Sequence, residues 1–376
     1  MIEYAVQTGD TFYGIARKFS IPTELLHSAN PDIPINTLNI GQIILLPHTR
    51  MVRDAIDVNG FALPTINAQA LEDRLPYLSW LSPLSYTVQS NGTLAYTDDA
   101  APRRAARKAG VATMMVISNI GESGAYSGAL VHDVLSSQEA QRTLLVTIVT
   151  QLHEKGYYGL IVDFQHIFPT DYGEYAIFVQ MVSETLRPLG YIVCTTVRLS
   201  VITQERNRLN EALQYTDYRR FFNKYILMNN ECPPADGTIQ SLNLLQGAVE
   251  FSTSLFPSQM MLLDISNCCY DWLMPLQNEA IPHQLSIGEA GSLSNYAEKG
   301  IEMDTSTRTP FFQYHDIEGN YHIVCPSSTE TEYESLSLIQ DYNLGGASFW
   351  RIELCSLDCF IGVAIHFEIR KPLATI

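Results

Sequence analysis

Asp163 and Gln165 stand at the end of the short apolar run Leu160–Val162 in this chain of 376 residues. An acid and an amide two residues apart at a strand end are the strongest candidates in this chain for a chemical site. The run has the composition of a buried strand, and residues two apart on a strand point the same way. We therefore expect Asp163 and Gln165 to share a face, with Phe164 packed behind them. A strand end with two solvated polar caps would explain the same pattern.

The stretch around Asp163 belongs to a longer alternation of strand and helix patterns that begins near Val58. The predicted strands are 58–63, 80–88, 112–118, 158–165, 191–197, 225–228, 260–265 and 346–350. The predicted helices between them are 67–76, 98–109, 137–155, 171–189, 216–222, 239–251 and 330–343. Such alternation is typical of a parallel sheet wrapped by helices. The pattern predicts an α/β fold, a (β/α)8 TIM barrel, whose active sites lie at the C-terminal ends of the strands.

The rest of the chain divides around this barrel. We predict a separate module at residues 1–48, a linker at 49–57 and the barrel at 58–376, with a small α+β insertion at about 271–328. The insertion carries a hairpin signal, because two strand-like runs, 309–315 and 321–324, flank a turn at Gly319.

The N-terminal module has the order strand, helix, helix, strand. Gly9-Asp10-Thr11 forms a turn that can cap the first helix. The module resembles a LysM domain through its residues Val6, Gly9-Asp10-Thr11, Ile15-Ala16, Phe19, Leu25, Asn30-Pro31, Gly41-Gln42 and Pro47. This resemblance implies that it binds N-acetylglucosamine polymers, peptidoglycan or chitin, in a shallow groove between two loops. The candidate contacts are Gly9, Asp10, Thr11, Phe12, Pro31, Asp32 and Ile33. Turn and cap roles explain Gly9, Asp10 and Asn30 equally well.

The barrel is similar to glycoside hydrolase family 18. It shares the segments 81–86, 91–94, 156–164, 270–272, 310–314 and 346–350. More narrowly, the whole chain resembles bacterial spore enzymes that join LysM domains to such a barrel and degrade fragments of cortex peptidoglycan.

The resemblance implies a specific reaction. A carboxylic acid at the end of the fourth strand protonates the glycosidic oxygen, and the acetamido oxygen of the substrate attacks the anomeric carbon. Asp163 matches the aspartate that orients the acetamido group, and Trp350 matches the sugar-stacking floor. By the same resemblance, Tyr86, Met228, Asn230 and Glu231 are candidates for the wall of the site.

Gln165 occupies the position of the acid, and an amide cannot deliver a proton at useful pH. General acid catalysis contributes roughly 10²–10⁴-fold. Ile161 stands where the family carries Asp or Asn, Tyr158 where many members carry Asp, and Asn230 where it carries Tyr. These departures favour a natural loss of catalysis over an engineered exchange, while Glu231 remains an alternative, displaced acid.

The charge balance limits the partners. With 23 Lys and Arg against 40 Asp and Glu, the net charge is −17. This argues against nucleic acid and anionic membranes, which need basic patches, but not against a neutral glycan. No run approaches the ~20 apolar residues of a membrane helix, and no secretory signal pattern is visible. We predict no nucleic-acid partner and no membrane insertion.

Neither a metal nor a cofactor is predicted. His132, His153, His166, His283, His315 and His322 show no metal spacing, and the seven cysteines contain no Cys-x-x-Cys pair. Mostly reduced thiols are expected, with cross-links at Cys268-Cys269 or Cys355 and Cys359 left open. His166 is expected to alternate to the packing side as a structural histidine.

Three functions follow from these patterns. The first is a catalytically inactive, glycan-binding homologue of a hydrolase, made in the cytoplasm without a signal peptide and placed at the spore coat or cortex surface. The second is an active N-acetylglucosaminidase that hydrolyses cortex fragments. The third is a structural protein of the spore coat whose barrel binds no sugar and whose partners are other coat proteins.

Overall fold

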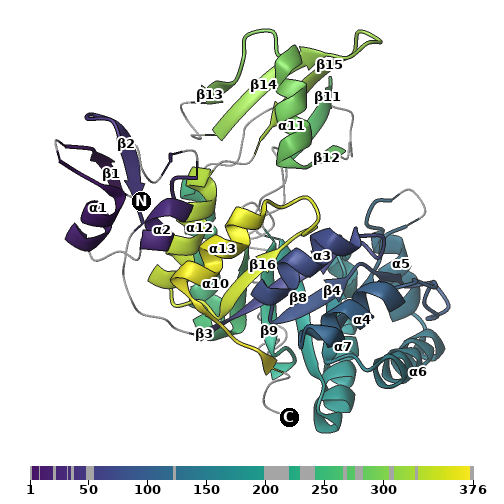
Figure 1. Ribbon diagram of the computed structural model, residues 1–376. Helices are drawn as coiled ribbons and strands as arrows, with labels where there is room; N and C mark the ends of the chain where they lie inside the picture. The colour runs from purple at the N-terminus through teal and green to yellow at the C-terminus, as the bar shows by residue number, and fades with distance from the viewer. Residues whose placement is uncertain are drawn as a thin grey trace. The chain divides into compact units, whose positions relative to one another are not determined.

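A computed structural model describes residues 2–7, 9–19, 23–31, 33–34, 38–47, 55–121, 124–198, 220–228, 242–265, 269–275, 283–304, 309–326 and 329–372. The chain divides into two compact units (Figure 1). One comprises residues 1–55 with 361–368, and the other comprises residues 56–360 with 369–376.

The N-terminal module has the predicted order of elements. Its strands β1 (Ile2–Ala5) and β2 (Ile43–Leu46) pair antiparallel, and its helices are α1 (Phe12–Lys18) and α2 (Thr23–Ser28). The side chain of Asn30 holds α2 to β2, because its amide nitrogen donates to the carbonyls of Leu26 (2.7 Å) and Leu45 (2.9 Å). Its oxygen accepts from the Leu45 amide at 2.8 Å. Asn30 is therefore a structural clamp.

The second unit is a closed parallel barrel, as predicted. Its strands are β3 (Ala55–Ala62), β4 (Trp80–Pro83), β6 (Ala112–Ser118), β7 (Gly159–Asp163), β8 (Ile192–Arg198), β9 (Lys224–Met228), β10 (Met261–Asp264) and β16 (Gly346–Phe349). They pair in the order β16-β10-β9-β8-β7-β6-β4-β3, and the pairing of β16 with β3 closes the ring. Two short strands are added: β5 (Tyr86–Thr87) pairs with β6, and β17 (Glu368–Ile369) lies beside β3.

The predicted strand 80–88 is interrupted in the structure, since β4 ends at Pro83 and β5 begins at Tyr86. Proline has no N–H to continue the ladder. This break changes the direction of Tyr86, as described below.

Helices follow most of the strands. They are α3 (Ala68–Arg74), α4 (Ala100–Lys108), α5 (Gly128–Leu135), α6 (Gln138–Lys155), α7 (Tyr172–Leu186), α10 (Leu242–Leu255), α12 (Thr329–Asp341) and α13 (Leu357–His366). Short 3-10 helices are η1 (Leu75–Tyr77), η2 (Pro169–Asp171), η3 (Arg187–Leu189), η5 (Ser258–Met260) and η6 (Ser294–Tyr296). Helices α5 and α13 were not predicted, and residues 216–219 of the predicted helix 216–222 lie outside the described residues.

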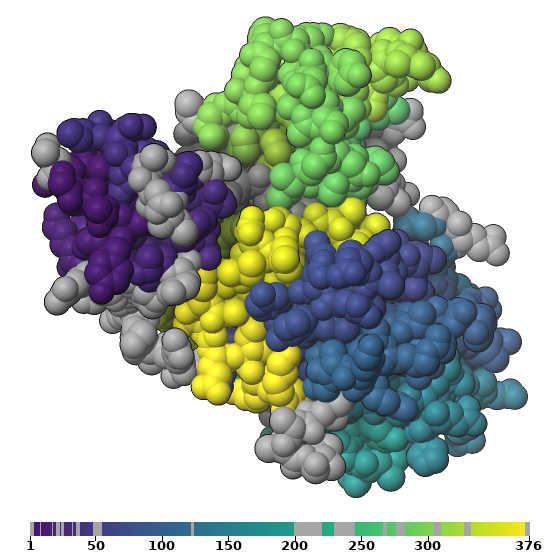
Figure 2. All heavy atoms as spheres, viewed as in Figure 1, coloured from purple at the N-terminus to yellow at the C-terminus, as the bar shows by residue number. Residues whose placement is uncertain are grey.

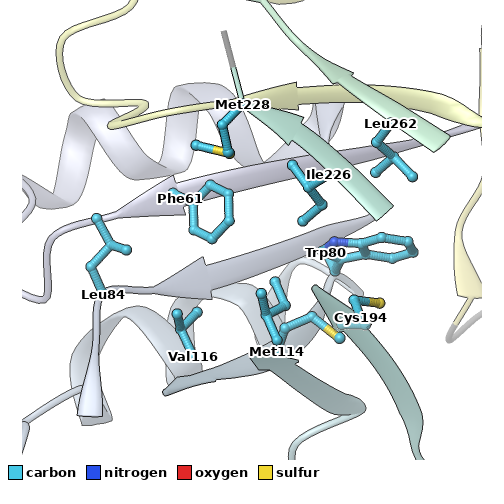
Figure 3. Close-up of a cluster of buried hydrophobic side chains, with 11 residues drawn as sticks. Phe61, Trp80, Leu84, Met114, Val116, Cys194, Ile226, Met228 and Leu262 are labelled. Carbon is cyan, nitrogen blue, oxygen red and sulfur yellow. The ribbon is translucent and has the colours of Figure 1, made fainter. Parts of the chain in front are cut away.

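The barrel interior is filled with side chains. Figure 3 shows residues from several strands meeting there, and the cluster comprises Phe61, Trp80, Leu84, Ala112, Met114, Val116, Ile161, Cys194, Ile226, Met228 and Leu262. Burial raises the pKa of the Cys194 thiol to about 12. The centre is thus a packed core and not a pore, and a ligand must bind at its end.

The insertion is a five-stranded sheet with one helix. Its elements are β11 (Cys269–Met274), β12 (His283–Leu285), α11 (Ile287–Leu293), β13 (Glu302–Asp304), β14 (Thr309–His315) and β15 (Tyr321–Cys325), with the sheet order β12-β11-β15-β14-β13. The predicted hairpin is confirmed as β14 and β15. Figure 2 shows the atoms of these elements, in light green, packed closely against one another.

A polar cluster joins three strands of the insertion. The buried Asp271 accepts from the Tyr314 hydroxyl at 2.9 Å, and its other oxygen lies 2.8 Å from Nδ1 of His322. The rings of Tyr314 and His322 stack at 4.8 Å. Because each strand contributes one of these residues, the cluster fixes the register of β14 and β15 on β11.

Closure of the barrel depends on Gly346. A Cβ atom there would lie 1.9 Å from the backbone oxygen of Asp57, its register partner on β3. We expect Gly346→Ala to destabilise the protein by about 1–3 kcal/mol or more, since the strands would have to separate. Chemical denaturation monitored by circular dichroism measures this.

A matched control is Gly247→Ala on α10, where a Cβ meets nothing within 4 Å. We expect it to stabilise the helix by about 0.5–1 kcal/mol. Equal stability of the Gly346→Ala variant and the unmodified protein would contradict the argument.

Candidate functional site

The Asp163 carboxylate lies at the C-terminal end of β7 and is 2% exposed. One oxygen, Oδ1, accepts from the Thr196 hydroxyl at 2.6 Å and from Nε2 of Gln165 at 2.8 Å. The other, Oδ2, accepts from the Tyr126 hydroxyl at 2.7 Å. A buried carboxylate needs such partners to replace the water that it has lost. A carboxylate has about four lone-pair sites, so a fourth donor can still bind.

Gln165 lies beside Asp163, as the sequence predicted. Its Nε2 also donates to the Thr196 hydroxyl at 2.8 Å, which closes a triangle of three polar groups. Phe164 turns away and is buried, with its ring 6.4 Å from both Tyr175 and Phe178 of α7. The predicted alternation of faces is therefore confirmed, and the amide at position 165 acts as a donor toward Asp163.

Asn119 fixes the backbone of Gln165. Its Oδ1 accepts from the Gln165 amide at 2.9 Å, and its Nδ2 donates to the carbonyl of Gln165 at 2.8 Å. Nδ2 also donates to the Ser127 carbonyl at 2.9 Å. Asn119 is fully buried and was missed in the sequence. Its position directly after the predicted strand 112–118, beside the strand that carries Asp163, is the signal that could have revealed it.

Tyr126 was also missed. It lies in the loop after β6 and forms an isolated antiparallel β-bridge with Ile120. Burial and the nearby Asp163 charge raise the pKa of the Tyr126 hydroxyl well above its usual value. The hydroxyl therefore keeps its proton at neutral pH and donates it in the hydrogen bond to Asp163. Nothing in the spacing of the sequence places this loop residue at the site.

The prediction that His166 turns to the packing side is wrong. Its φ of 56° is left-handed, so the chain leaves the strand alternation immediately after Gln165. The His166 side chain is exposed, and its Nε2 lies 2.7 Å from Nη1 of Arg198, which ends β8. Its ring centroid is 6.4 Å from that of Tyr126. His166 and Arg198 thus belong to the surroundings of Asp163.

Trp350 directly follows β16 at the same end of the barrel as Asp163. It is half-buried against the barrel core, with its ring centroid 5.2 Å from that of Phe61. This placement is compatible with a floor for a sugar. Met228 is 3% exposed within the core cluster, so it shapes the interior more than it offers surface to a ligand.

Tyr86 lies elsewhere, although we predicted it in the wall of the site. It is buried, and its hydroxyl contacts Asp99 Oδ2 at 2.7 Å, Tyr157 at 3.2 Å and Lys155 Nζ at 2.5 Å. Asp99 precedes α4 and Lys155 ends α6. Tyr86 therefore points toward the helices outside the barrel, and its hydroxyl is engaged by this buried cluster. The other two wall candidates, Asn230 and Glu231, lie outside the described residues.

In the LysM module the predicted contacts separate into two groups. Gly9, with φ 87°, and Thr11 are exposed, while Asp10 is held by Tyr4 (2.7 Å) and the Gln7 amide (2.8 Å). The Gln7 hydrogen bond and the Tyr4 hydroxyl lower the pKa of Asp10. Phe12 is 1% exposed in the module core, so the prediction of a glycan contact there is wrong.

The second loop of the module offers Pro31, which is exposed, and Ile33, which packs on the module core. Asp32 lies outside the described residues. Tyr13, missed in the sequence, is 67% exposed directly after Phe12. An exposed aromatic ring beside the first loop is the kind of surface on which a sugar stacks.

Neither a metal centre nor a membrane span is found in the described part of the chain. Its His, Cys, Asp and Glu side chains form no group of three that could hold a metal ion. None of its helices is long and apolar enough to cross a membrane.

Comparison with known proteins agrees with both units. Residues 4–47 match the LysM domain. The cortical fragment-lytic enzyme of Bacillus subtilis is 26% identical over 307 residues, which cover 81% of this chain and 71% of that protein. The Bacillus subtilis protein YdhD, provisionally named a sporulation-specific glycosylase, is 24% identical over 356 residues, with coverage of 93% and 84%. The chain is similar to spore glycosylases.

Solved structures show the same fold. The spore cortex-lytic enzyme SleL of Bacillus megaterium QM B1551 has a TM-score of 0.78 at 23% identity, covering 98% of this chain and 87% of that chain. A chitinase from Chromobacterium violaceum ATCC 12472 has a TM-score of 0.68 at 19% identity, covering 84% and 100%. The fold of the barrel is thus one that chitinases and spore cortex-lytic enzymes share.

An ion pair braces the helices behind the site. His132 of α5 lies 2.9 Å from the buried Asp171, which precedes α7. The hydrogen bond and charge of Asp171 raise the pKa of His132. A histidine whose pKa is higher in the folded than in the unfolded protein stabilises the folded state. This stabilisation is complete at pH values below the unfolded pKa of about 6.5, and it is lost as the pH rises through the folded pKa.

We therefore expect His132→Gln to destabilise the protein at pH 5.5 and to have a smaller effect at pH 8.5. Denaturation midpoints at the two pH values measure this. His153→Gln, on the exposed side of α6, serves as the control and should show no such dependence. An effect of His132→Gln that is larger at pH 8.5 would contradict the pairing.

Proposed function

We propose that this protein binds N-acetylglucosamine-containing glycan, such as spore-cortex peptidoglycan, through its LysM module and through the barrel end around Asp163, and that it does not hydrolyse it. The proposal places it at the surface of the spore coat or cortex, among coat proteins. Its support is the similarity to the cortical fragment-lytic enzyme and to spore cortex-lytic enzymes of Bacillus.

The observation that carries the proposal is the hydrogen bonding of the Gln165 side chain. Its amide nitrogen is committed as a donor to both Asp163 and Thr196. A carboxamide has no proton to give at neutral pH, so the group that the resemblance assigns to protonation of the leaving oxygen is missing. Asp163, in contrast, remains a buried acceptor that can receive the N–H of an acetamido group.

The residue beneath Asp163 supports the same conclusion. Ile161 points into the barrel from β7 and is fully buried in the core cluster. The resemblance places Asp or Asn there. An apolar side chain packed at this layer indicates that the difference from the family 18 pattern is not confined to position 165. The core has adapted to it.

An active N-acetylglucosaminidase is the main alternative. The intact hydrogen bonding of Asp163 favours it, because only the acid is absent from that triangle. The two functions separate in one experiment.

The full chain and its Gln165→Glu variant are incubated with an N-acetylglucosamine tetramer and with cortex fragments, and products are measured by mass spectrometry. We expect no turnover by the unmodified chain. In the variant, a carboxyl beside Asp163 would share a proton with it, so its pKa would be raised as an acid requires. A gain of roughly 10²-fold or more over background would then be expected.

Binding is followed in the same samples by tryptophan fluorescence. All three tryptophans, Trp80, Trp272 and Trp350, lie outside residues 4–47, so the signal reports the barrel and not the LysM module. A Trp350→Phe variant should lose most of the change.

Each outcome has a clear meaning. Turnover by the unmodified chain would overturn the non-catalytic function. Binding without turnover by either the unmodified chain or the variant supports the non-catalytic function. It would also mean that the loss of catalysis involves residues other than Gln165. Absence of any fluorescence change would leave glycan binding to the LysM module, as expected for a structural coat protein.

A further inference from the structure

Three side chains on the helical layer form a hydrogen-bonded series to which the proposed function gives no task. They are Asp171, His132 and Ser136. Nδ1 of His132 lies 2.9 Å and 3.0 Å from the two carboxylate oxygens of Asp171. Nε2 of the same ring lies 3.4 Å from the Ser136 hydroxyl. An acid, an imidazole and a hydroxyl joined in this order are the three groups of a serine hydrolase triad.

Two packed elements hold these groups together. His132 is in the last turn of α5, and Ser136 is the C-cap residue of that helix. The two residues are four apart, so they lie on the same face. Asp171 immediately precedes α7, and α5 packs against both α6 and α7.

The hydrogen bonds define which nitrogen of His132 carries the proton. A carboxylate can only accept, so the neutral imidazole is protonated at Nδ1 and its Nε2 accepts from Ser136. This is the tautomer in which an imidazole can remove the proton of a hydroxyl nucleophile. The Asp171 carboxylate is buried, whereas Ser136 is exposed. The distance of 3.4 Å is long for a hydrogen bond, but such bonds often shorten when a substrate binds.

A helix N-terminus lies directly after the Ser136 hydroxyl. Helix α6 begins at Gln138, and Oγ of its N-cap residue Ser137 accepts from the Ala140 N–H at 3.2 Å. The N–H groups of Gln138 and Glu139 have no acceptor within the helix. These groups and the helix dipole favour negative charge at this end. Negative charge develops on the carbonyl oxygen of an ester when a nucleophile attacks it.

The surface around the imidazole can admit a small substrate. The side chain of His132 is 49% exposed. The Phe168 ring, which is 43% exposed, has its centroid 6.2 Å from that of His132 and offers one apolar wall. A single ring can cover a small acyl group but not a long chain. Water also reaches the imidazole, so we expect slow turnover.

We propose that Ser136 and His132, positioned by Asp171, form a second catalytic centre that hydrolyses esters of small acyl groups such as acetate. The Ser136 oxygen bonds to the carbonyl carbon while its proton passes to Nε2 of His132. The bond from that carbon to the alcohol oxygen then breaks, and His132 returns the proton to this oxygen. Water, deprotonated in the same way, releases the carboxylic acid and restores the serine. The inference does not depend on the proposed function, because it uses other residues than those around Asp163.

The test measures hydrolysis of 4-nitrophenyl acetate by the full chain at pH 8. A second sample is treated with a fluorophosphonate, which forms a covalent bond with an activated serine, and its peptides are analysed by mass spectrometry. We expect one phosphonyl group per chain, on Ser136.

Ser136→Ala should abolish the labelling and lower kcat/KM for the ester by about 10²-fold. His132→Gln should have the same effect, and at pH 8 it disturbs the folded state less than in acid. Ser292→Ala is the matched control, because this exposed hydroxyl on α11 donates to the Gly288 carbonyl at 2.9 Å and faces no base. It should keep the activity and the labelling.

The pH profile separates a positioning role of Asp171 from a merely structural one. Only the neutral imidazole accepts a proton, so the rate should rise as the pH passes the pKa of His132. The hydrogen bond and the charge of Asp171 raise this pKa, and the charge of Asp133 on α5 raises it further. Asp171→Asn should therefore shift the midpoint to lower pH, and it should lower the plateau rate because an amide does not fix the tautomer.

Absence of a label on Ser136 in the unmodified chain would overturn the inference. Unchanged hydrolysis by Ser136→Ala would also overturn it, since the imidazole alone would then account for the turnover. Labelling of the unmodified chain decides the matter even if a variant folds poorly. Neither result bears on glycan binding at the barrel, which is measured separately.

Discussion

A buried carboxylate is tolerated only when hydrogen bonds replace the water it has lost, and this requirement organises the end of the barrel around Asp163. Its three donors come from three segments: the loop after β6, strand β8 and the residue that follows β7 by two positions. Each must be held in place by its own neighbours. Closure of the ring between β16 and β3 keeps the strands in register, and Asn119 ties the first segment to the third.

The sequence predicted much of this arrangement, because strands have a simple period. Apolar runs separated by helical patterns indicated the eight strands, and alternation placed Asp163 and Gln165 on one face with Phe164 on the other. Buried strands of a parallel barrel are nearly continuous apolar segments, which makes their ends easy to locate. The structure confirms these predictions through the Gln165–Asp163 contact.

The errors arose where the backbone leaves that period. Pro83 ends β4, so the alternation that puts Trp80 and Leu84 inside the barrel no longer governs Tyr86, which reaches Asp99 instead. His166 adopts a left-handed φ, which turns its ring to the surface. Tyr126 acts from a loop, whose path is set by tertiary hydrogen bonds and leaves no periodic signal, whereas Asn119 directly follows β6 and was missed although a strand end marks its position. In the LysM module, Phe12 was predicted to contact the glycan, but it directly follows the first loop as the first residue of α1 and packs in the module core.

The clamp formed by Asn119 has an evolutionary consequence. Its side chain hydrogen-bonds to the backbone N–H and C=O of residue 165 and not to the side chain. The main chain therefore keeps its path whichever residue stands there. Glutamine and glutamate have the same shape, and their codons differ by a single nucleotide. A lineage carrying this scaffold can therefore exchange a proton donor for an inert amide, or the reverse, without rebuilding the fold. The backbone clamp of Asn119 therefore accommodates either glutamine or glutamate at position 165 on one main-chain path.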